Sequence, residues 1–191
     1  VPLIIKSKDR AGTNITSGSF HYYDYDVTGN ESWTPQNNPA AVMYGDDKDT
    51  IRIENTLRIH KGASLAMNGL VVELGGQGRI ILEADANTND YGSQLLLTNS
   101  KLTSFRGCGN EDSVWQGVIV KGNASKGQQA ITANANGVTR YQGMLVMNNS
   151  EISYAREAVR LWSADNPSIG IDGTGGIVVA TGSRFYNNTR S

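Results

Sequence analysis

Two stretches near the end of the chain share one pattern, and that pattern decides the fold class. Residues 143–150 read GMLVMNNS, and residues 176–183 read GIVVATGS. In both, a glycine opens a short apolar strand, and a small turn residue and a serine follow. The alignment needs no gap and makes these pairs: Leu145 with Val178, Met147 with Ala180, Ser150 with Ser183, and Ile152 with Phe185. Such self-similarity indicates a repeat architecture.

The same pattern occurs earlier in the chain. Residues 62–69 read GASLAMNG and residues 92–100 read GSQLLLTNS, and a further strand, WQGVIVKG, is expected at 115–122. The glycines that open these strands stand at positions 62, 92, 117, 143 and 176. Uneven spacing around constant strand cores indicates a solenoid whose loops differ in length.

One apolar face in each repeat has to be buried against the next repeat. Stacking is therefore expected to build an interior wall from Leu65, Met67, Leu95, Leu97, Leu145, Met147, Val178 and Ala180. Glycine and asparagine tolerate the left-handed backbone needed at corners. A corner ladder is expected from Asn68, Asn99, Asn149 and Asn188. The repeat favours a parallel β-helix, and a jelly roll, which also uses short strands and glycine-rich turns, is the alternative.

The chain divides into two regions within what we expect to be one structural domain. Residues 1–49 lack the glycine repeat and are predicted to form an irregular N-terminal strand and cap region, with strands near 2–6 and 21–27. Residues 50–191 are predicted to form the coils, and the native polypeptide is expected to continue beyond them. The stretch 153–161 could be a short helix, but its place in the repeat favours a strand at 158–161.

Composition excludes several classes of protein. The 17 Lys and Arg residues nearly balance 18 Asp and Glu, so the chain lacks the basic character of a nucleic-acid binder. Its apolar runs are too short to span a bilayer. We therefore expect neither a nucleic-acid partner nor a membrane-spanning segment. The 22 glycines and 18 asparagines are typical of a chain rich in turns and strands. Polar composition of this kind fits an exported protein, although the N-terminus lacks the features of a signal peptide.

Several segments of the chain match a pattern found in a known family. The segments that carry it are 29–34 (GNESWT), 50–59 (TIRIENTLRI), 62–65 (GASL), 108–109 (CG), 115–118 (WQGV) and 143–154, the strand-Asn-Asn-Ser-strand repeat. Together they resemble right-handed parallel β-helix domains of the pectate-lyase-like type, found in large secreted or cell-surface bacterial proteins. The resemblance implies an all-β fold and an extracellular or cell-surface location. Relatives often carry a second cysteine near the positions of Gly69 or Ser100, so Cys108 is expected to be free here.

Candidate binding residues come from loops and from the N-terminal region. The sequence predicts no cofactor, with Ca²⁺ as the alternative. Asp46, Asp47 and Asp49 supply carboxylates for Ca²⁺, but without the spacing of an EF-hand loop. Trp162 and Asp165 are expected in a loop where an aromatic ring could meet a sugar. Tyr44 belongs to a group of aromatic residues that serves either ligand binding or the cap: Tyr22, Tyr23, Tyr25, Trp33 and Tyr44.

Catalytic patterns are weak. Glu73, Glu83 and Glu151 are scattered over the outward positions rather than stacked. A basic strip of Arg160, Arg184 and Arg190 is conceivable, although exposed arginines on strands usually serve solvation.

We therefore expect a non-catalytic β-helix module of a secreted or cell-surface protein, for adhesion, glycan binding or as a structural stalk. A polysaccharide lyase or glycoside hydrolase acting on an extended polysaccharide is the first alternative. An assembly subunit whose coil ends stack on other chains is the second.

Overall fold

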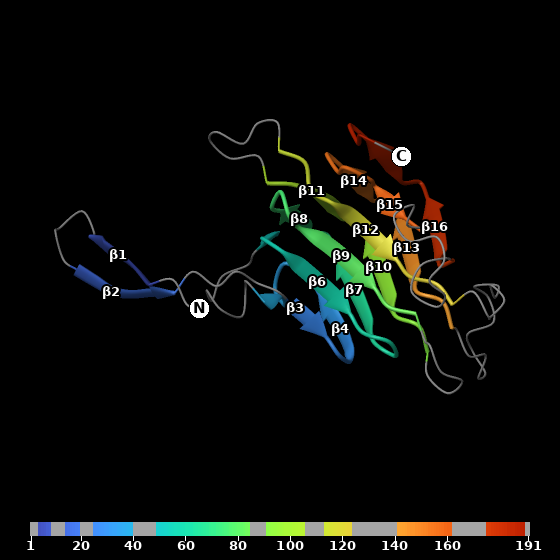
Figure 1. Cartoon of the computed structure of the whole chain (residues 1–191), viewed down its shortest axis with the longest axis horizontal. Coiled ribbons are helices and arrows are strands. Elements are labelled where there is room, and N and C mark those ends of the chain that lie inside the picture. Colours follow the sequence, from blue (N-terminus) through green and yellow to red (C-terminus); the bar gives the residue numbers. More distant parts are fainter. Residues whose placement is uncertain are drawn as a thin grey trace.

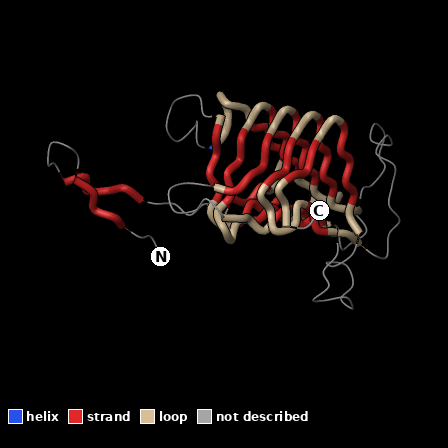
Figure 2. Tube along the Cα trace, turned by 90° about the horizontal axis from the view of Figure 1, so that it is seen from above, coloured by secondary structure: helices blue, strands red, loops and turns tan. Residues whose placement is uncertain are grey.

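The computed structural model describes residues 4–8, 14–19, 25–39, 49–84, 91–105, 113–123, 141–161 and 175–189. Within them nearly every regular element is a β-strand, and three sheets of five strands each run through the body of the molecule (Figure 1). All strand pairs in these three sheets are parallel. The chain passes from one sheet to the next and returns one level further along, which is a parallel β-helix (Figure 2).

Each sheet takes every third strand in the coil. The first sheet contains β3 (Tyr25–Val27), β6 (Thr56–Ile59), β9 (Arg79–Leu82), β12 (Gly117–Val120) and β15 (Val159–Arg160). The second sheet contains β4 (Asn30–Trp33), β7 (Ser64–Asn68), β10 (Gln94–Thr98), β13 (Met144–Asn148) and β16 (Ile177–Thr181). The third sheet contains β5 (Thr50–Ile53), β8 (Val71–Leu74), β11 (Lys101–Ser104), β14 (Glu151–Ser153) and β17 (Arg184–Tyr186).

The register of the strands confirms the repeat found in the sequence. Leu145 pairs with Val178 between β13 and β16, and Ile152 pairs with Phe185 between β14 and β17. A parallel register is set by the apolar pattern, because a slip of one residue would turn every core side chain outward. The expected strand at 158–161 is also confirmed, since β15 pairs with β12 in the first sheet.

The core is the column of apolar side chains enclosed by the three sheets. Leu65, Leu95 and Leu145 are fully buried in adjacent coils, as the interior wall requires. Trp115 is the largest fully buried side chain, and its indole Nε1 donates to the carbonyl of Ser153 at 2.9 Å. The expected wall fails only in the last coil. There Val178 is half-buried and Ala180 is exposed, because no described coil covers them.

The corner between the second and third sheets is built on left-handed residues. Asn99 and Asn149 have φ values of 47° and 48°, and glycines with φ values of 69° and 59° stand at the same corner in other coils, as Gly69 and Gly182. Glycine adopts this conformation most readily, and asparagine and aspartate adopt it at lower cost than other residues. The predicted asparagine ladder is therefore shorter than expected. Asn68 lies one position before its corner, and Asn188 makes hydrogen bonds elsewhere in the coil.

A serine ladder follows directly after this corner. The hydroxyl of Ser100 accepts from the backbone N–H of Leu70 at 3.2 Å, Ser150 accepts from Ser100 at 3.1 Å, and Ser183 accepts from Ser150 at 3.1 Å. Each hydroxyl also donates to the carbonyl two residues before it in its own chain segment. The ladder satisfies corner N–H groups that point along the coil axis, where an unpaired buried donor would be costly.

The N-terminal region contributes both a hairpin and coil strands. β1 (Ile4–Lys8) and β2 (Asn14–Ser19) pair antiparallel with each other. β3 and β4 pair with strands of the first and second sheets, so parallel pairing reaches back before residue 50. The division at residue 49 stays a prediction about domains. No helix in the described segments is long and apolar enough to cross a membrane.

Candidate functional site

The outer face of the third sheet carries a row of alternating charge. Lys101 on β11, Glu151 on β14 and Arg184 on β17 stand in register in three successive coils. The Lys101 ammonium lies 2.9 Å from Oε1 of Glu151, and Nε and Nη2 of Arg184 both lie 2.7 Å from Oε2. One carboxylate therefore bridges three coils through two cations.

The carboxylate of Glu151 is almost fully enclosed, with a side-chain exposure of 9%. The Ser153 hydroxyl makes hydrogen bonds to Oε1 of Glu151 at 3.0 Å and to Oγ1 of Thr103 at 3.1 Å. Burial on its own raises the pKa of Glu151, but the hydrogen bonds from Lys101, Arg184 and Ser153 outweigh it and lower the pKa overall. Glu151 therefore stays ionised at neutral pH.

The ammonium of Lys101 is held charged by the same contacts. Its hydrogen bond to Glu151 raises the pKa of Lys101, which outweighs the opposite effect of burial. Both cations lie near the ring of Tyr186, with Lys101 Nζ 5.9 Å and Arg184 Cζ 5.4 Å from the ring centroid. The cluster thus carries two positive charges and one negative charge, a net charge of +1.

A groove lies along the corner beside this cluster. Its volume is about 450 Å³, which falls within the usual range for ligand sites. It is lined by the corner residues and by the charged row, namely Asn99, Ser100, Lys101, Asn149, Ser150, Glu151, Gly182 and Arg184. The corner ladder, the serine ladder and the ion-paired row therefore meet at one place on the surface.

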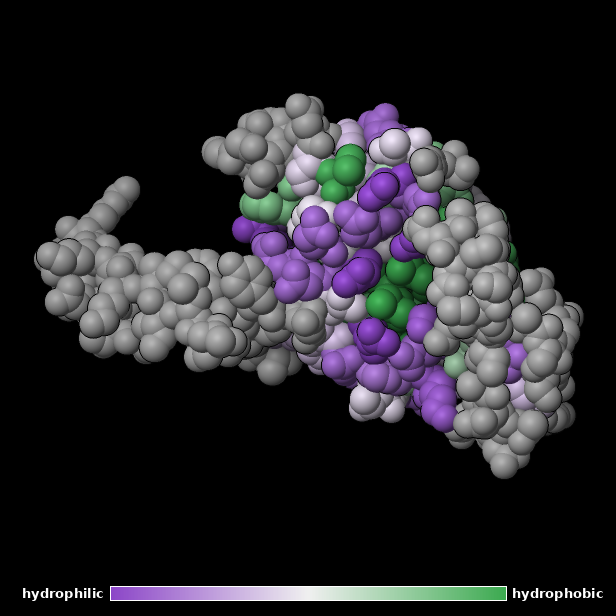
Figure 3. Space-filling model, in the orientation of Figure 1, coloured by the Kyte–Doolittle hydropathy of each residue, from purple (hydrophilic) through white to green (hydrophobic). Residues whose placement is uncertain are grey.

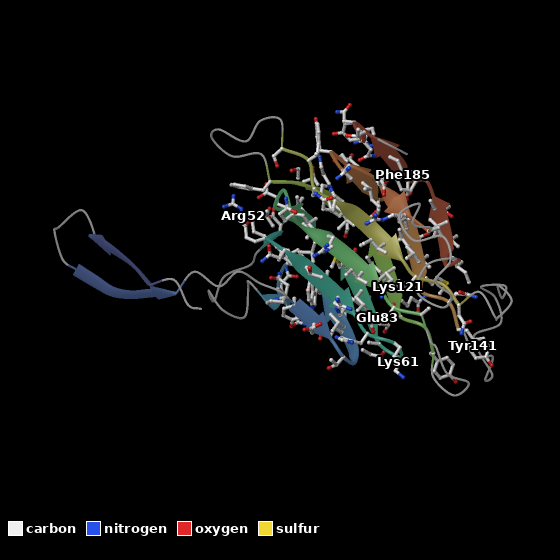
Figure 4. The ribbon with its side chains drawn as sticks, in the orientation of Figure 1. Arg52, Lys61, Glu83, Lys121, Tyr141 and Phe185 are labelled. Carbon is white, nitrogen blue, oxygen red and sulfur yellow. The ribbon has the colours of Figure 1, made fainter. Side chains whose placement is uncertain are left out.

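The first sheet carries a second charged cluster on its outer face. Glu83 accepts from Nη1 of Arg58 at 2.8 Å, and its other oxygen lies 3.3 Å from Nδ1 of His60. Nε2 of His60 lies 2.8 Å from Oδ1 of Asp26. Partial burial alone raises the pKa of Glu83, but the hydrogen bond from Arg58 and the charge of His60 make the net pKa shift downward. Figure 4 shows Glu83 on this face between Lys61 and Lys121.

A small apolar area interrupts the charged surface of the first sheet. Ile81 on β9 and Ile119 on β12 are neighbours in register, and the residues on either side of each point into the core. Strand alternation therefore places both isoleucines on the outer face. Figure 3 shows this hydrophobic area over β9 and β12 within a hydrophilic surround. Two aliphatic side chains are too small a patch to define a partner.

The aromatic residues of the N-terminal region close the first coil. Trp33 is 3% exposed, and the ring of Tyr25 meets it edge-on, with centroids 5.0 Å apart and planes at 83°. Nε1 of Trp33 donates to Oε2 of Glu31 at 2.9 Å. A hollow of about 350 Å³ lies beside them. For Tyr25 and Trp33, packing as a cap explains the positions, because the larger ring is buried.

Most of the residues predicted for binding lie outside the described segments. These are Tyr44, Asp46, Asp47, Trp162 and Asp165, together with Cys108 and Arg190. Asp49 is described and exposed, and its Oδ1 accepts from the hydroxyl of Thr50 at 3.1 Å. Among the residues that the structure describes, no group of three His, Cys, Asp or Glu side chains could hold a metal ion.

The basic strip considered from the sequence is wrong for its two described members. Arg160 lies on β15 in the first sheet, where its Nε is 3.3 Å from Oε2 of Glu157. Arg184 lies on β17 in the third sheet and pairs with Glu151. The two arginines belong to different sheets because β15 and β17 are two strands apart in a coil of three.

Sequence reasoning missed the row of Lys101, Glu151 and Arg184. The signal was present, because each follows a ladder serine directly: Ser100, Ser150 and Ser183. The alignment of 143–152 with 176–185 already pairs Glu151 with Arg184, and extending the segment 92–100 by one residue adds Lys101 to the same column. Comparison with protein-family models, curated proteins and solved structures gives no match for this chain.

Proposed function

We propose that this chain is a non-catalytic module of a secreted or cell-surface protein, in which the parallel β-helix acts as a stiff stalk. One observation carries the proposal: the charged and hydroxyl side chains beside the corner are used to tie successive coils together. Glu151 bridges three coils, and the serine ladder crosses the same corner. Networks of this kind rigidify a fold when every member is satisfied.

The electrostatics of the two carboxylate clusters support a structural role. A general acid at neutral pH needs a raised pKa. The pKa values of Glu83 and Glu151 are lowered instead, because cations and hydrogen-bond donors surround both groups. These carboxylates are suited to holding neighbouring cations rather than to donating protons.

The location and family relationship belong to the same proposal. Low charge with abundant glycine and asparagine supports export. The coil order and the asparagine corner support a relationship to pectate-lyase-like domains, which include both adhesins and enzymes. Adhesion and glycan binding are compatible with a stalk, because binding needs only a groove on its surface.

A turnover screen tests the non-catalytic role. The full chain is incubated with acidic and neutral polysaccharides, with and without Ca²⁺, and both unsaturated-product absorbance and reducing ends are followed. We expect no turnover on any substrate. A polysaccharide lyase or glycoside hydrolase would show turnover, and its loss in Glu83→Gln would assign the reaction to the first sheet.

An assembly subunit is the remaining alternative. Among the described strands, β16 pairs with β13 alone, and it carries no charged residue or proline. Edge strands of this kind invite pairing with other chains. Molecular mass measured over a range of protein concentrations tests this role. A stalk predicts constant mass, and a mass that rises with concentration would favour assembly.

A further inference from the structure

We propose that the corner groove between the second and third sheets binds a sugar that carries a carboxylate or sulfate group. This site goes beyond the stalk role and can fail while that role stands. Its elements are two asparagine amides in adjacent coils and the outer edge of one arginine.

The asparagine amides supply hydrogen bonds for hydroxyl groups. Asn99 and Asn149 line the groove one coil apart, at a spacing of about 4.8 Å between neighbouring strands. Both residues are exposed, and their side-chain amides make no hydrogen bond within the described segments. An amide offers both a donor and an acceptor, and a sugar hydroxyl can pair with either. Their left-handed backbone is fixed by the corner, which sets where both side chains leave the chain beside the groove.

Arg184 supplies the charge recognition. Its Nε and Nη2 contact Glu151 along one edge of the guanidinium, and its side chain is 75% exposed. Nη1 makes no ion pair with any described carboxylate, so the edge formed by Nη1 and Nη2 is open to solvent. A guanidinium edge binds a carboxylate or sulfate through two parallel hydrogen bonds. Glu151 holds the arginine in position while Lys101 keeps the local charge positive.

The net charge of the cluster favours an anion over a neutral sugar. Lys101 and Arg184 together exceed Glu151 by one positive charge. The other ion pair on this sheet, between Arg52 and Glu73, is balanced and adds no net charge. An anionic group is therefore attracted to the corner groove and not to the Arg52–Glu73 pair at the other end of the same sheet.

The test compares saturable binding of three probes to the full chain by titration calorimetry. The probes are an oligogalacturonate, a sulfated oligosaccharide and a neutral oligosaccharide of similar length. We expect one or both anionic probes to bind and the neutral probe to bind at least about tenfold more weakly, since charged hydrogen bonds are worth more than neutral ones. The two anionic probes distinguish a carboxylate from a sulfate ligand.

Three variants locate the site. Arg184→Gln should weaken anionic binding at least about tenfold. The double variant Asn99→Gly with Asn149→Gly keeps the left-handed corner, because Gly69 and Gly182 already occupy equivalent positions, and should weaken binding about three- to tenfold. Arg52→Gln is the matched control, an exposed ion-paired arginine elsewhere on the third sheet, and should leave binding within about twofold.

Several results would overturn the proposal. Absence of saturable binding by either anionic probe would remove the site. An equal loss in Arg52→Gln and Arg184→Gln would show general attraction to positive charge. Binding that survives both Arg184→Gln and the asparagine double variant would place a glycan site elsewhere, and the stalk proposal would be unaffected. Thermal unfolding of each variant confirms that it is folded.

Discussion

The first and the last described coils differ in how far their core side chains are covered. At the N-terminal end, Trp33 and Tyr25 pack against each other over the interior, and Asn38 is buried with its amide donating to the carbonyl of Thr34 at 2.7 Å. In the last described coil, the equivalent wall residues are partly open, and Phe185 is 37% exposed. The same repeat position thus forms core in one described coil and surface in another.

The edge strands differ in the same way. Glu31 on β4 occupies the column of Leu65, a position that points into the core. Inward-pointing charge is one of the devices that protect sheet edges from pairing with other chains. β16, at the other edge of this sheet, consists of Ile177, Val178, Val179, Ala180 and Thr181. On β4, Glu31 therefore protects the edge of the sheet from pairing with other chains. β16 carries no charged residue that could do the same.

The largest difference between the ends is expected from aromatic truncation. Trp33→Ala should reduce the free energy of unfolding by about 3–5 kcal/mol, because it removes a buried ring and leaves a cavity. Phe185→Ala should cost only about 1 kcal/mol, because the ring is already more than a third exposed. Denaturant unfolding of both variants measures the two values. Equal losses would show that the C-terminal coil is packed as tightly as the first.

The serine ladder predicts a second, smaller difference in stability between an inner coil and the last described coil. Ser150→Ala should cost about 1–3 kcal/mol, because it leaves the backbone N–H of Ser100 without its acceptor in a buried corner. Ser183→Ala should cost less than about 1 kcal/mol, because water reaches the more open end. The free energy of unfolding of the two variants is the measurement. A larger loss of stability in Ser183→Ala than in Ser150→Ala would mean that the contribution of a ladder hydrogen bond does not increase with its burial.

The fold could be predicted from the sequence because its signals are local and repeated. The alternation of Leu145 and Met147, and the matching Val178, fix which face of each strand is buried. Because parallel stacking places equivalent positions side by side, one correct alignment predicts many contacts at once. The first coil is harder to predict, because β4 carries Glu31 and Trp33 where the repeat has leucine and methionine.

The candidate site was less accessible to sequence reasoning. Lone charged residues such as Glu151 look like solvated surface until the register of three coils is known. The open guanidinium edge of Arg184 depends on which of its atoms face Glu151, and no sequence pattern carries that information. The sequence favours loop residues such as Trp162, whose role in binding stays a prediction.

The smallest contrast concerns the ion pairs that tie coils near each end. The pKa values of both Glu151 and Glu83 are lowered in the folded protein. Each carboxylate therefore stabilises the fold above its unfolded pKa of about 4.3, and the contribution is lost as the pH falls through the lower folded pKa. Glu151→Gln should reduce stability at neutral pH by about 1 kcal/mol and flatten the acid limb of the stability curve.

Local amide hydrogen exchange distinguishes the effects of the Glu151–Arg184 and Glu83–Arg58 ion pairs. Glu151 holds Arg184 on β17, so Glu151→Gln should speed amide hydrogen exchange in β17 and leave β6 unchanged. Glu83 holds Arg58 on β6, so Glu83→Gln should have the reverse effect. Hydrogen exchange followed by mass spectrometry at neutral pH measures both strands in each variant. Uniform acceleration along the whole coil would show that the ion pairs act on global stability, and the two ends would then open as one cooperative unit rather than independently.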